Sequence, residues 1–61
     1  MLVEVYRIVN GEKKPIFYTE DLETGLAAYR ANAEKMPRIS IDGHQLTIAE
    51  AENLANRKEQ P

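Results

Sequence analysis

Residues 2–19 read LVEVYRIVNGEKKPIFYT. Both halves of this stretch are rich in β-branched and aromatic residues, which favour strands. Between the halves stand Asn10 and Gly11, a dipeptide that accepts the positive φ angles of a type I′ turn. The stretch therefore predicts a β-hairpin with strands at 2–9 and 12–19.

A two-residue turn sets the register that we expect for this hairpin. On one side of the ribbon, called the Val side, the expected pairs are Val9–Glu12, Arg7–Lys14, Val5–Ile16 and Val3–Tyr18. On the opposite side they are Ile8–Lys13, Tyr6–Pro15, Glu4–Phe17 and Leu2–Thr19. Because Pro15 has no N–H to donate to a further strand, we expect strand 12–19 at an edge of the sheet.

A change of apolar period after residue 19, from two to about three and a half, predicts an amphipathic helix from 19 or 21 to 36. Its apolar stripe consists of Leu22, Leu26, Tyr29, Ala33 and Met36. Pro37 ends this helix, because the residue before a proline is pushed out of the α region. Gly25 weakens the helix by roughly 1 kcal/mol relative to alanine, so a start near Thr24 is the alternative.

A second, shorter hairpin is predicted after the helix. Residues 38–41 favour a strand, and Asp42 and Gly43 form another dipeptide typical of a hairpin turn. The chain then returns through a very short strand at 44–46.

The last element begins with the sequence of a capping box. Thr47 and Glu50 have the Thr-x-x-Glu spacing in which each side chain accepts a hydrogen bond from the other residue's backbone N–H. This spacing predicts the start of a helix that covers about 48–58. The helix would present Ile48, Ala51, Leu54 and Ala55 on one stripe.

The order of these elements predicts an α+β fold, a small two-layer sandwich with ββαββα order. A strand that follows a helix crossover lies parallel to the strand before the helix, and so antiparallel to the first strand. With Pro15 closing one edge, the third strand pairs beside the first. We therefore expect one domain over residues 1–61, with a mostly antiparallel sheet of order 2-1-3-4 and helices packed on it.

Composition excludes several classes of protein. The 61 residues contain no cysteine, which excludes a disulfide scaffold or a thiolate metal site and fits a cytoplasmic location. Neither a membrane-spanning segment nor a signal peptide is indicated. The formal net charge of −2 argues against binding of polyanions through bulk charge.

The hairpin carries more apolar groups than one layer of helices covers. Leu2, Tyr6, Ile8 and Phe17 are expected on the side opposite the Val side, so this side or its edge is predicted to bind a partner protein or a second copy of the chain. Two alternatives stay open: the second helix wraps to that side, or long Lys and Glu side chains cover it. The leading hypothesis is a non-enzymatic interaction module, such as a small regulator or inhibitor.

Basic side chains on the same hairpin support a different hypothesis. Arg7, Lys13 and Lys14 alternate with aromatic residues, a pattern that can hold a phosphate backbone and stack a base. Neutralisation by Glu4 and Glu12, or lysines that protect an edge strand from aggregation, would explain the same residues. Nucleic-acid binding is therefore the second hypothesis.

Catalytic or metal chemistry has little support in the sequence. His44 is the single histidine and Ser40 the single serine, and both flank the second turn. A metal site would need further His or Cys ligands. We expect no cofactor, no metal, no small-molecule substrate and no membrane partner, and an enzyme in which His44 works with a neighbouring acid is only a third hypothesis.

Overall fold

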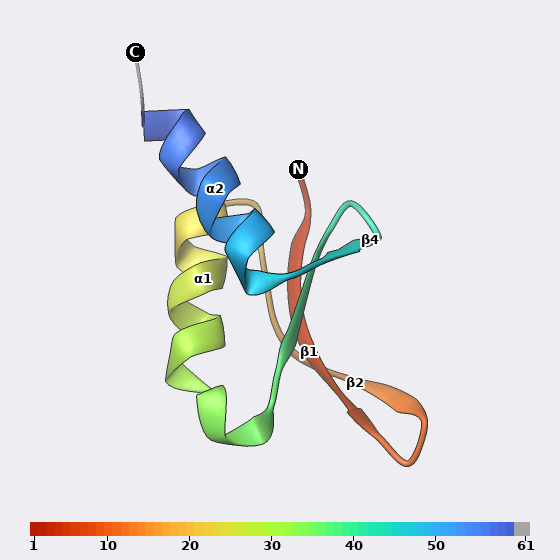
Figure 1. Cartoon of the computed structure of the whole chain (residues 1–61). Coiled ribbons are helices and arrows are strands. Elements are labelled where there is room, and N and C mark those ends of the chain that lie inside the picture. Colours follow the sequence, from red (N-terminus) through yellow and green to blue (C-terminus); the bar gives the residue numbers. More distant parts are fainter. Residues whose placement is uncertain (60–61) are drawn as a thin grey trace.

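The computed structural model describes the backbone of residues 1–59 and the side chains of residues 1–57. Its elements are β1 (Val3–Val9), β2 (Glu12–Thr19), α1 (Leu22–Ala31), the 3-10 helix η1 (Ala33–Lys35), β3 (Arg38–Ile41), β4 (His44–Leu46) and α2 (Ile48–Glu59). The four strands form one antiparallel sheet of order β2-β1-β3-β4 (Figure 1). The α+β fold and the predicted strand order are therefore confirmed.

Both hairpin turns have the expected backbone. Asn10 and Gly11 have φ angles of 52° and 79°, and Asp42 and Gly43 have φ angles of 50° and 85°. Two successive positive φ angles are typical of a type I′ turn, whose twist matches that of the strands it joins. Pro15 lies in β2, at the edge of the sheet, as predicted.

The register of the first hairpin departs from the prediction at a β-bulge. Near the turn the expected pairs form, as far as Tyr6 with Pro15, but the next pair is Val5 with Phe17. Ile16 is therefore the extra residue of the bulge, and every pair beyond it shifts by one position. Pro15 directly precedes this bulge, and prolines within sheets are found mainly on edge strands and at bulges.

The shift exchanges the two aromatic residues that follow the bulge. Tyr18 pairs with Glu4 and Phe17 pairs with Val5, so the predicted pairs Val3–Tyr18 and Glu4–Phe17 are both wrong. Directly opposed residues share a side of the sheet. Tyr18 therefore lies on the side opposite the Val side, and Phe17 lies on the Val side.

Helix α1 begins within the predicted limits and ends earlier. The carboxylate of Asp21 accepts a hydrogen bond from the backbone N–H of Thr24 at 3.1 Å, which makes Asp21 the N-cap. At the other end, the side-chain amide and the backbone N–H of Asn32 both donate to the carbonyl of Ala28, at 2.8 and 3.1 Å. These bonds close the helix at Ala31, five residues before the predicted end.

The early end of α1 removes two residues from the predicted apolar stripe. Leu22 and Leu26 are buried and Tyr29 is half-buried, but Ala33 and Met36 are exposed. Met36 follows η1 and has φ 53° and ψ 58°, a left-handed conformation that cannot continue a helix.

Gly25 allows α1 to approach β1 closely. A Cβ atom added to Gly25 would lie 2.5 Å from Cγ1 of Val3, a distance at which something must move. The residue that the sequence predicts to weaken the helix therefore lies where the sheet leaves no room for a side chain on the helix.

The capping box of α2 forms as predicted. The N–H of Glu50 donates to Oγ1 of Thr47 at 3.1 Å, and the N–H of Thr47 donates to Oε1 of Glu50 at 3.0 Å. Ala51 and Ala55 are buried and Ile48 is half-buried, whereas Leu54, the fourth residue of the predicted stripe, is exposed.

Both helices pack on the Val side of the sheet (Figure 1). The core consists of Val3, Val5, Leu22, Leu26, Ile39, Ala51 and Ala55. It takes residues from β1, β3 and both helices, so the alternative in which α2 wraps to the far side is wrong. The other side of the sheet has no helix against it, and the tip of the β1–β2 hairpin projects beyond both helices (Figure 1).

Candidate interaction surface

The side of the sheet without helices is the candidate site, and we call it the uncovered face. Side chains alternate along a strand, and Val3 and Val5 point to the core, so the even-numbered residues from 2 to 8 point to this face. The pairing adds their partners from the neighbouring strands. Its main members are Leu2, Glu4, Tyr6, Ile8, Lys13, Tyr18, Arg38 and Ser40.

The centre of the uncovered face is a cluster around the carboxylate of Glu4. This side chain is only 9% exposed although no helix covers it. It forms an ion pair with Lys13, and a hydrogen bond with Tyr18 raises the pKa of that phenol. A hydrogen bond to the same carboxylate raises the pKa of Lys13. Both shifts stabilise the proton on the donor, so the cluster holds three side chains in place rather than activating one of them.

Tyr6 lies beneath this cluster. The ammonium group of Lys13 stands 4.9 Å from the centre of its ring, within the range of a cation–π interaction. Tyr6 is consequently only 7% exposed. The alternative in which long Lys and Glu side chains cover the face therefore holds for Tyr6, and Tyr6 has little surface to offer a partner.

The other predicted protein-binding residues have different positions. Leu2 and Ile8 are exposed on the uncovered face, whereas the bulge places Phe17 on the Val side, exposed at the sheet edge. Tyr18, which was not among the predicted residues, is 54% exposed on the uncovered face. The structure thus places Leu2, Ile8 and Tyr18 on one face, with Leu2 and Ile8 at opposite ends of β1, and separates Phe17 from them.

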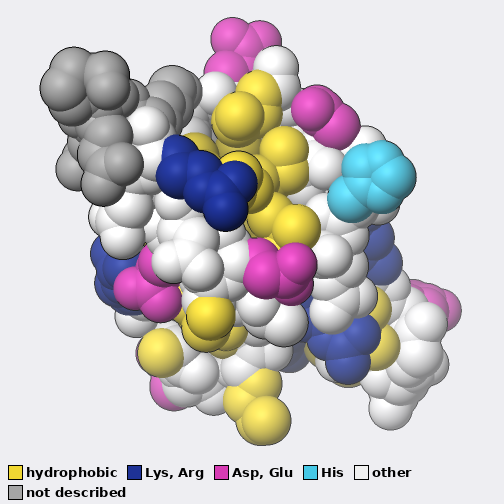
Figure 2. Space-filling model, turned by 45° about the horizontal axis from the view of Figure 1, so that its top comes forward, with side chains coloured by type: hydrophobic (Ala, Val, Ile, Leu, Met, Phe, Trp, Pro, Cys, Tyr) yellow, Lys and Arg dark blue, Asp and Glu magenta, His cyan; other side chains and the backbone are white. Residues whose placement is uncertain are grey.

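The basic residues of the nucleic-acid hypothesis have carboxylate partners in two of three cases. Lys13 pairs with Glu4, and Nζ of Lys14 lies 3.0 Å from Oε2 of Glu12. Arg7 faces Lys14 across the hairpin, as predicted, and makes no ion pair within the described part of the chain. Charges of both signs are also interspersed on the face seen in Figure 2. Glu4 and Glu12 therefore neutralise the two lysines, as the alternative explanation predicts.

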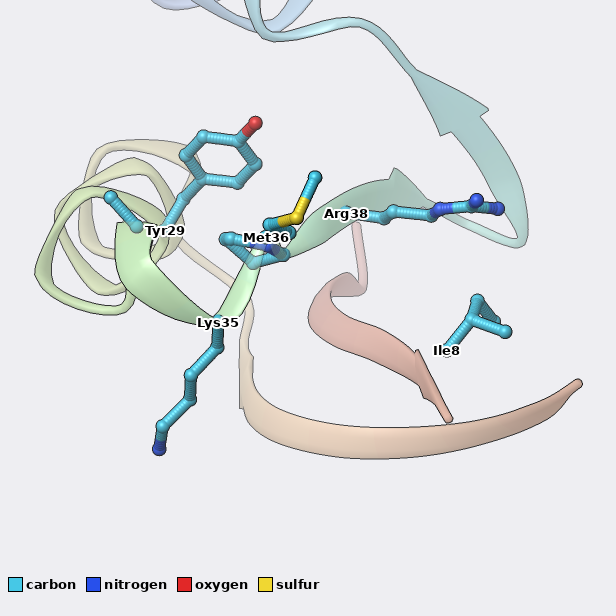
Figure 3. Close-up of a pocket in the computed structure, with 7 residues that line it drawn as sticks. Ile8, Tyr29, Lys35, Met36 and Arg38 are labelled. Atoms are coloured by element: carbon cyan, nitrogen blue, oxygen red, sulfur yellow. The ribbon is translucent and has the colours of Figure 1, made fainter. Parts of the chain in front are cut away.

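A hollow at the end of the sheet was not expected from the sequence. It lies where β3 begins, has a volume of about 530 Å³, and is bordered by Ile8, Tyr29, Met36 and Arg38 among others (Figure 3). Met36 is 83% exposed. The early end of α1 leaves Met36 at this hollow, and Asn32 is the residue from which that end could have been predicted. Its side chain can donate a hydrogen bond to a preceding carbonyl, which favours the end of a helix.

The residues considered for catalysis lie apart from this hollow. His44 is exposed in β4, and the cyan side chain in Figure 2 shows the histidine at the surface. Ser40 is buried in the sheet between Glu4 and Gln45. Among residues 1–57, no three His, Cys, Asp or Glu side chains are grouped so that they could hold a metal ion. No helix in the described residues is long and apolar enough to cross a membrane.

Comparison of the chain with protein-family models, curated proteins and solved structures found no match.

Proposed function

We propose that this protein is a non-enzymatic interaction module that binds a partner protein through the uncovered face. The observation that carries the proposal is the exposure of Leu2, Ile8 and Tyr18 on one side of a sheet whose other side holds both helices. Exposed apolar groups that share one face mark interaction sites more often than scattered ones do.

The uncovered face is also ordered before any partner arrives. Glu4 holds both the hydroxyl of Tyr18 and the ammonium of Lys13. A side chain that is already fixed loses less conformational entropy on binding, which favours affinity. Tyrosine in addition offers a large apolar ring with one polar end, the combination that is enriched in interfaces.

The test uses capture of partners by the immobilised protein, with quantitative mass spectrometry as the readout. Leu2→Thr/Tyr18→Thr removes two exposed apolar groups from the uncovered face and keeps residues that favour strands. Leu54→Gln removes an exposed leucine from α2 and is the matched control. We expect a specific partner to be lost with the face variant and retained with the control.

Two outcomes would overturn the proposal. In the first, every captured protein binds wild type and the face variant equally. In the second, the protein binds a labelled oligonucleotide tightly and ever more weakly as salt rises, which would support the nucleic-acid hypothesis through Arg7, Lys13 and Lys14. Sedimentation over a range of concentrations adds a direct check on whether the partner is a second copy of this chain.

A further inference from the structure

The hollow beside Met36 lies next to a length of β1 that has a strand on one side only. Pairing between β1 and β3 ends at Tyr6 with Arg38, while pairing between β1 and β2 continues to Val9. The last residues of β1 therefore have β2 on one flank and no strand on the other among the described residues. An open flank of this kind can accept an extended segment from another chain.

The backbone of Ile8 supplies the hydrogen-bonding groups of this open flank. In a hairpin closed by a two-residue turn, Val9 and Glu12 form a hydrogen-bonded pair, so the N–H and C=O of Ile8 point away from β2. The same alternation accounts for the bond in which the N–H of Asp42 donates to the carbonyl of Leu2 at 2.8 Å on the β3 flank. Ile8 thus presents one donor and one acceptor to a strand lying beside it.

Met36 does not pair with Ile8, although it is the residue that could. If the β1–β3 pairing continued for two more residues, Met36 would lie opposite Ile8. The left-handed backbone of Met36 instead turns the chain away from β1. A non-glycine residue in this conformation costs about 1 kcal/mol or more. The turn leaves the thioether exposed at the border of the hollow, between Tyr29 and Arg38 (Figure 3).

The borders of the hollow combine apolar surface with positive charge. Ile8, Tyr29, Met36 and Pro37 supply apolar surface, and methionine adapts its shape to different contacts. Lys35 and Arg38 are both exposed, and neither has a carboxylate partner in the portion of the chain that is described. Two unpaired cations in a chain of net charge −2 favour an acidic occupant.

We propose that the hollow binds an extended acidic segment of a partner protein. The segment pairs with Ile8 along the open flank of β1 and places one apolar side chain against Met36 and Tyr29. Its carboxylates lie toward Arg38, while the Lys35 side chain points to the opposite side (Figure 3). This inference rests on the proposed function in that the protein binds other proteins. It adds a contact area that shares Ile8 and Arg38 with the uncovered face, and the chemistry of what that area recognises.

The experiment titrates the protein with a short fluorescent peptide that carries a central leucine between glutamates. Two control peptides carry lysines in place of the glutamates, or alanine in place of the leucine. Fluorescence anisotropy measures affinity, and nuclear magnetic resonance follows the backbone amides. We expect saturable binding of the acidic peptide, weaker binding of both controls, and the largest amide shifts at Ile8, Met36 and Arg38.

Substitutions locate the contact. Arg38→Gln removes one charged partner and should weaken the acidic peptide about tenfold, since hydrogen bonds to charged groups contribute roughly 1.5–3 kcal/mol. Arg57→Gln, at an exposed arginine on α2, is the matched control and should leave affinity unchanged. Leu2→Thr/Tyr18→Thr should bind the peptide as wild type does, which separates this test from that of the uncovered face.

The inference is overturned if the acidic peptide does not saturate, if the lysine peptide binds equally well, or if Arg38→Gln changes nothing. Amide shifts confined to Leu2 and Tyr18 would also overturn it, while supporting the proposed function. Loss of partner capture with an intact peptide site would have the opposite meaning, so the two proposals fail in different experiments.

Discussion

Replacing Gly25 by alanine tests the contact between α1 and β1 most directly. In an ordinary helix interior this change stabilises a protein by up to about 1 kcal/mol, because alanine is the better helix former. In this chain the added Cβ would lie 2.5 Å from Cγ1 of Val3. The substitution therefore sets helix propensity against steric overlap.

The steric effect should prevail. Forcing an extra methyl group into a packed core costs about 1–3 kcal/mol. Val3 is fully buried in a central strand, and its β-branched side chain has few alternative rotamers. After the gain in propensity is subtracted, Gly25→Ala should lower the free energy of unfolding by up to about 2 kcal/mol.

Urea unfolding followed by far-ultraviolet circular dichroism measures this change. Ala27→Gly, at an exposed position of the same helix, is the reference for propensity alone and should cost about 1 kcal/mol. Combining Gly25→Ala with Val3→Ala removes the overlapping atom, so the two effects should be non-additive by at least about 1 kcal/mol. A Gly25→Ala protein more stable than wild type would refute the argument that α1 and β1 touch here.

Four further predictions concern surface groups. Thr47→Ala should cost about 1 kcal/mol in urea unfolding, as the loss of a helix cap does. A hydrogen bond from the backbone of Thr47 lowers the pKa of Glu50. The ionised carboxylate therefore stabilises the fold at pH values above the ordinary glutamate pKa, and this contribution is lost as pH falls through the folded-state pKa. The difference in stability between wild type and Glu50→Gln should accordingly disappear in acid. Lys13→Met should destabilise the protein more than Lys14→Met, because only the first leaves a nearly buried carboxylate without its ion pair, and equal losses would contradict the described cluster. In an alkaline titration followed by ultraviolet absorbance, the signal removed by Tyr18→Phe should belong to a phenol that ionises above the ordinary tyrosine range, and its stabilising effect should be lost as pH rises through that raised pKa.

Features set by local chemistry could be predicted from the sequence. The two turns depend on residues that accept positive φ, and the cap of α2 depends on the spacing between Thr47 and Glu50. Pro15 marks an edge because it lacks a donor. Each of these signals acts over a few residues, and together with the direction of the strand that follows the helix they are sufficient to order the strands.

The position of the bulge could not be predicted in the same way. Strict alternation from the Asn10-Gly11 turn assigns every later residue to a side, so one extra residue reverses all assignments beyond it. Pro15 permitted a bulge without requiring one, since an edge strand also explains it. The choice depends on packing: Ile16 keeps its contact with the core, and the reversed alternation brings Tyr18 to Glu4. Such contacts between strands are not visible in either strand alone.

The end of α1 illustrates a similar competition. Apolar spacing continues through Ala33 to Met36, but the bonds from Asn32 to Ala28 stop the helix first. The spacing of apolar residues shows which of them would share a helix face. It does not show whether that face can reach the core. By Ala33 the chain has left the helix that packs on the sheet, so these residues have no core to enter.

The bulge and the early helix end are related through the surfaces they create. Each leaves an apolar residue exposed to solvent: Tyr18 on the uncovered face and Met36 at the hollow. An unconstrained fold would gain by burying both. Positions at which sequence rules fail are expected to be functional or strained ones. The two departures from prediction place Tyr18 and Met36 at the surfaces that the two proposals assign to partner binding, so these residues are where the proposals are tested most directly.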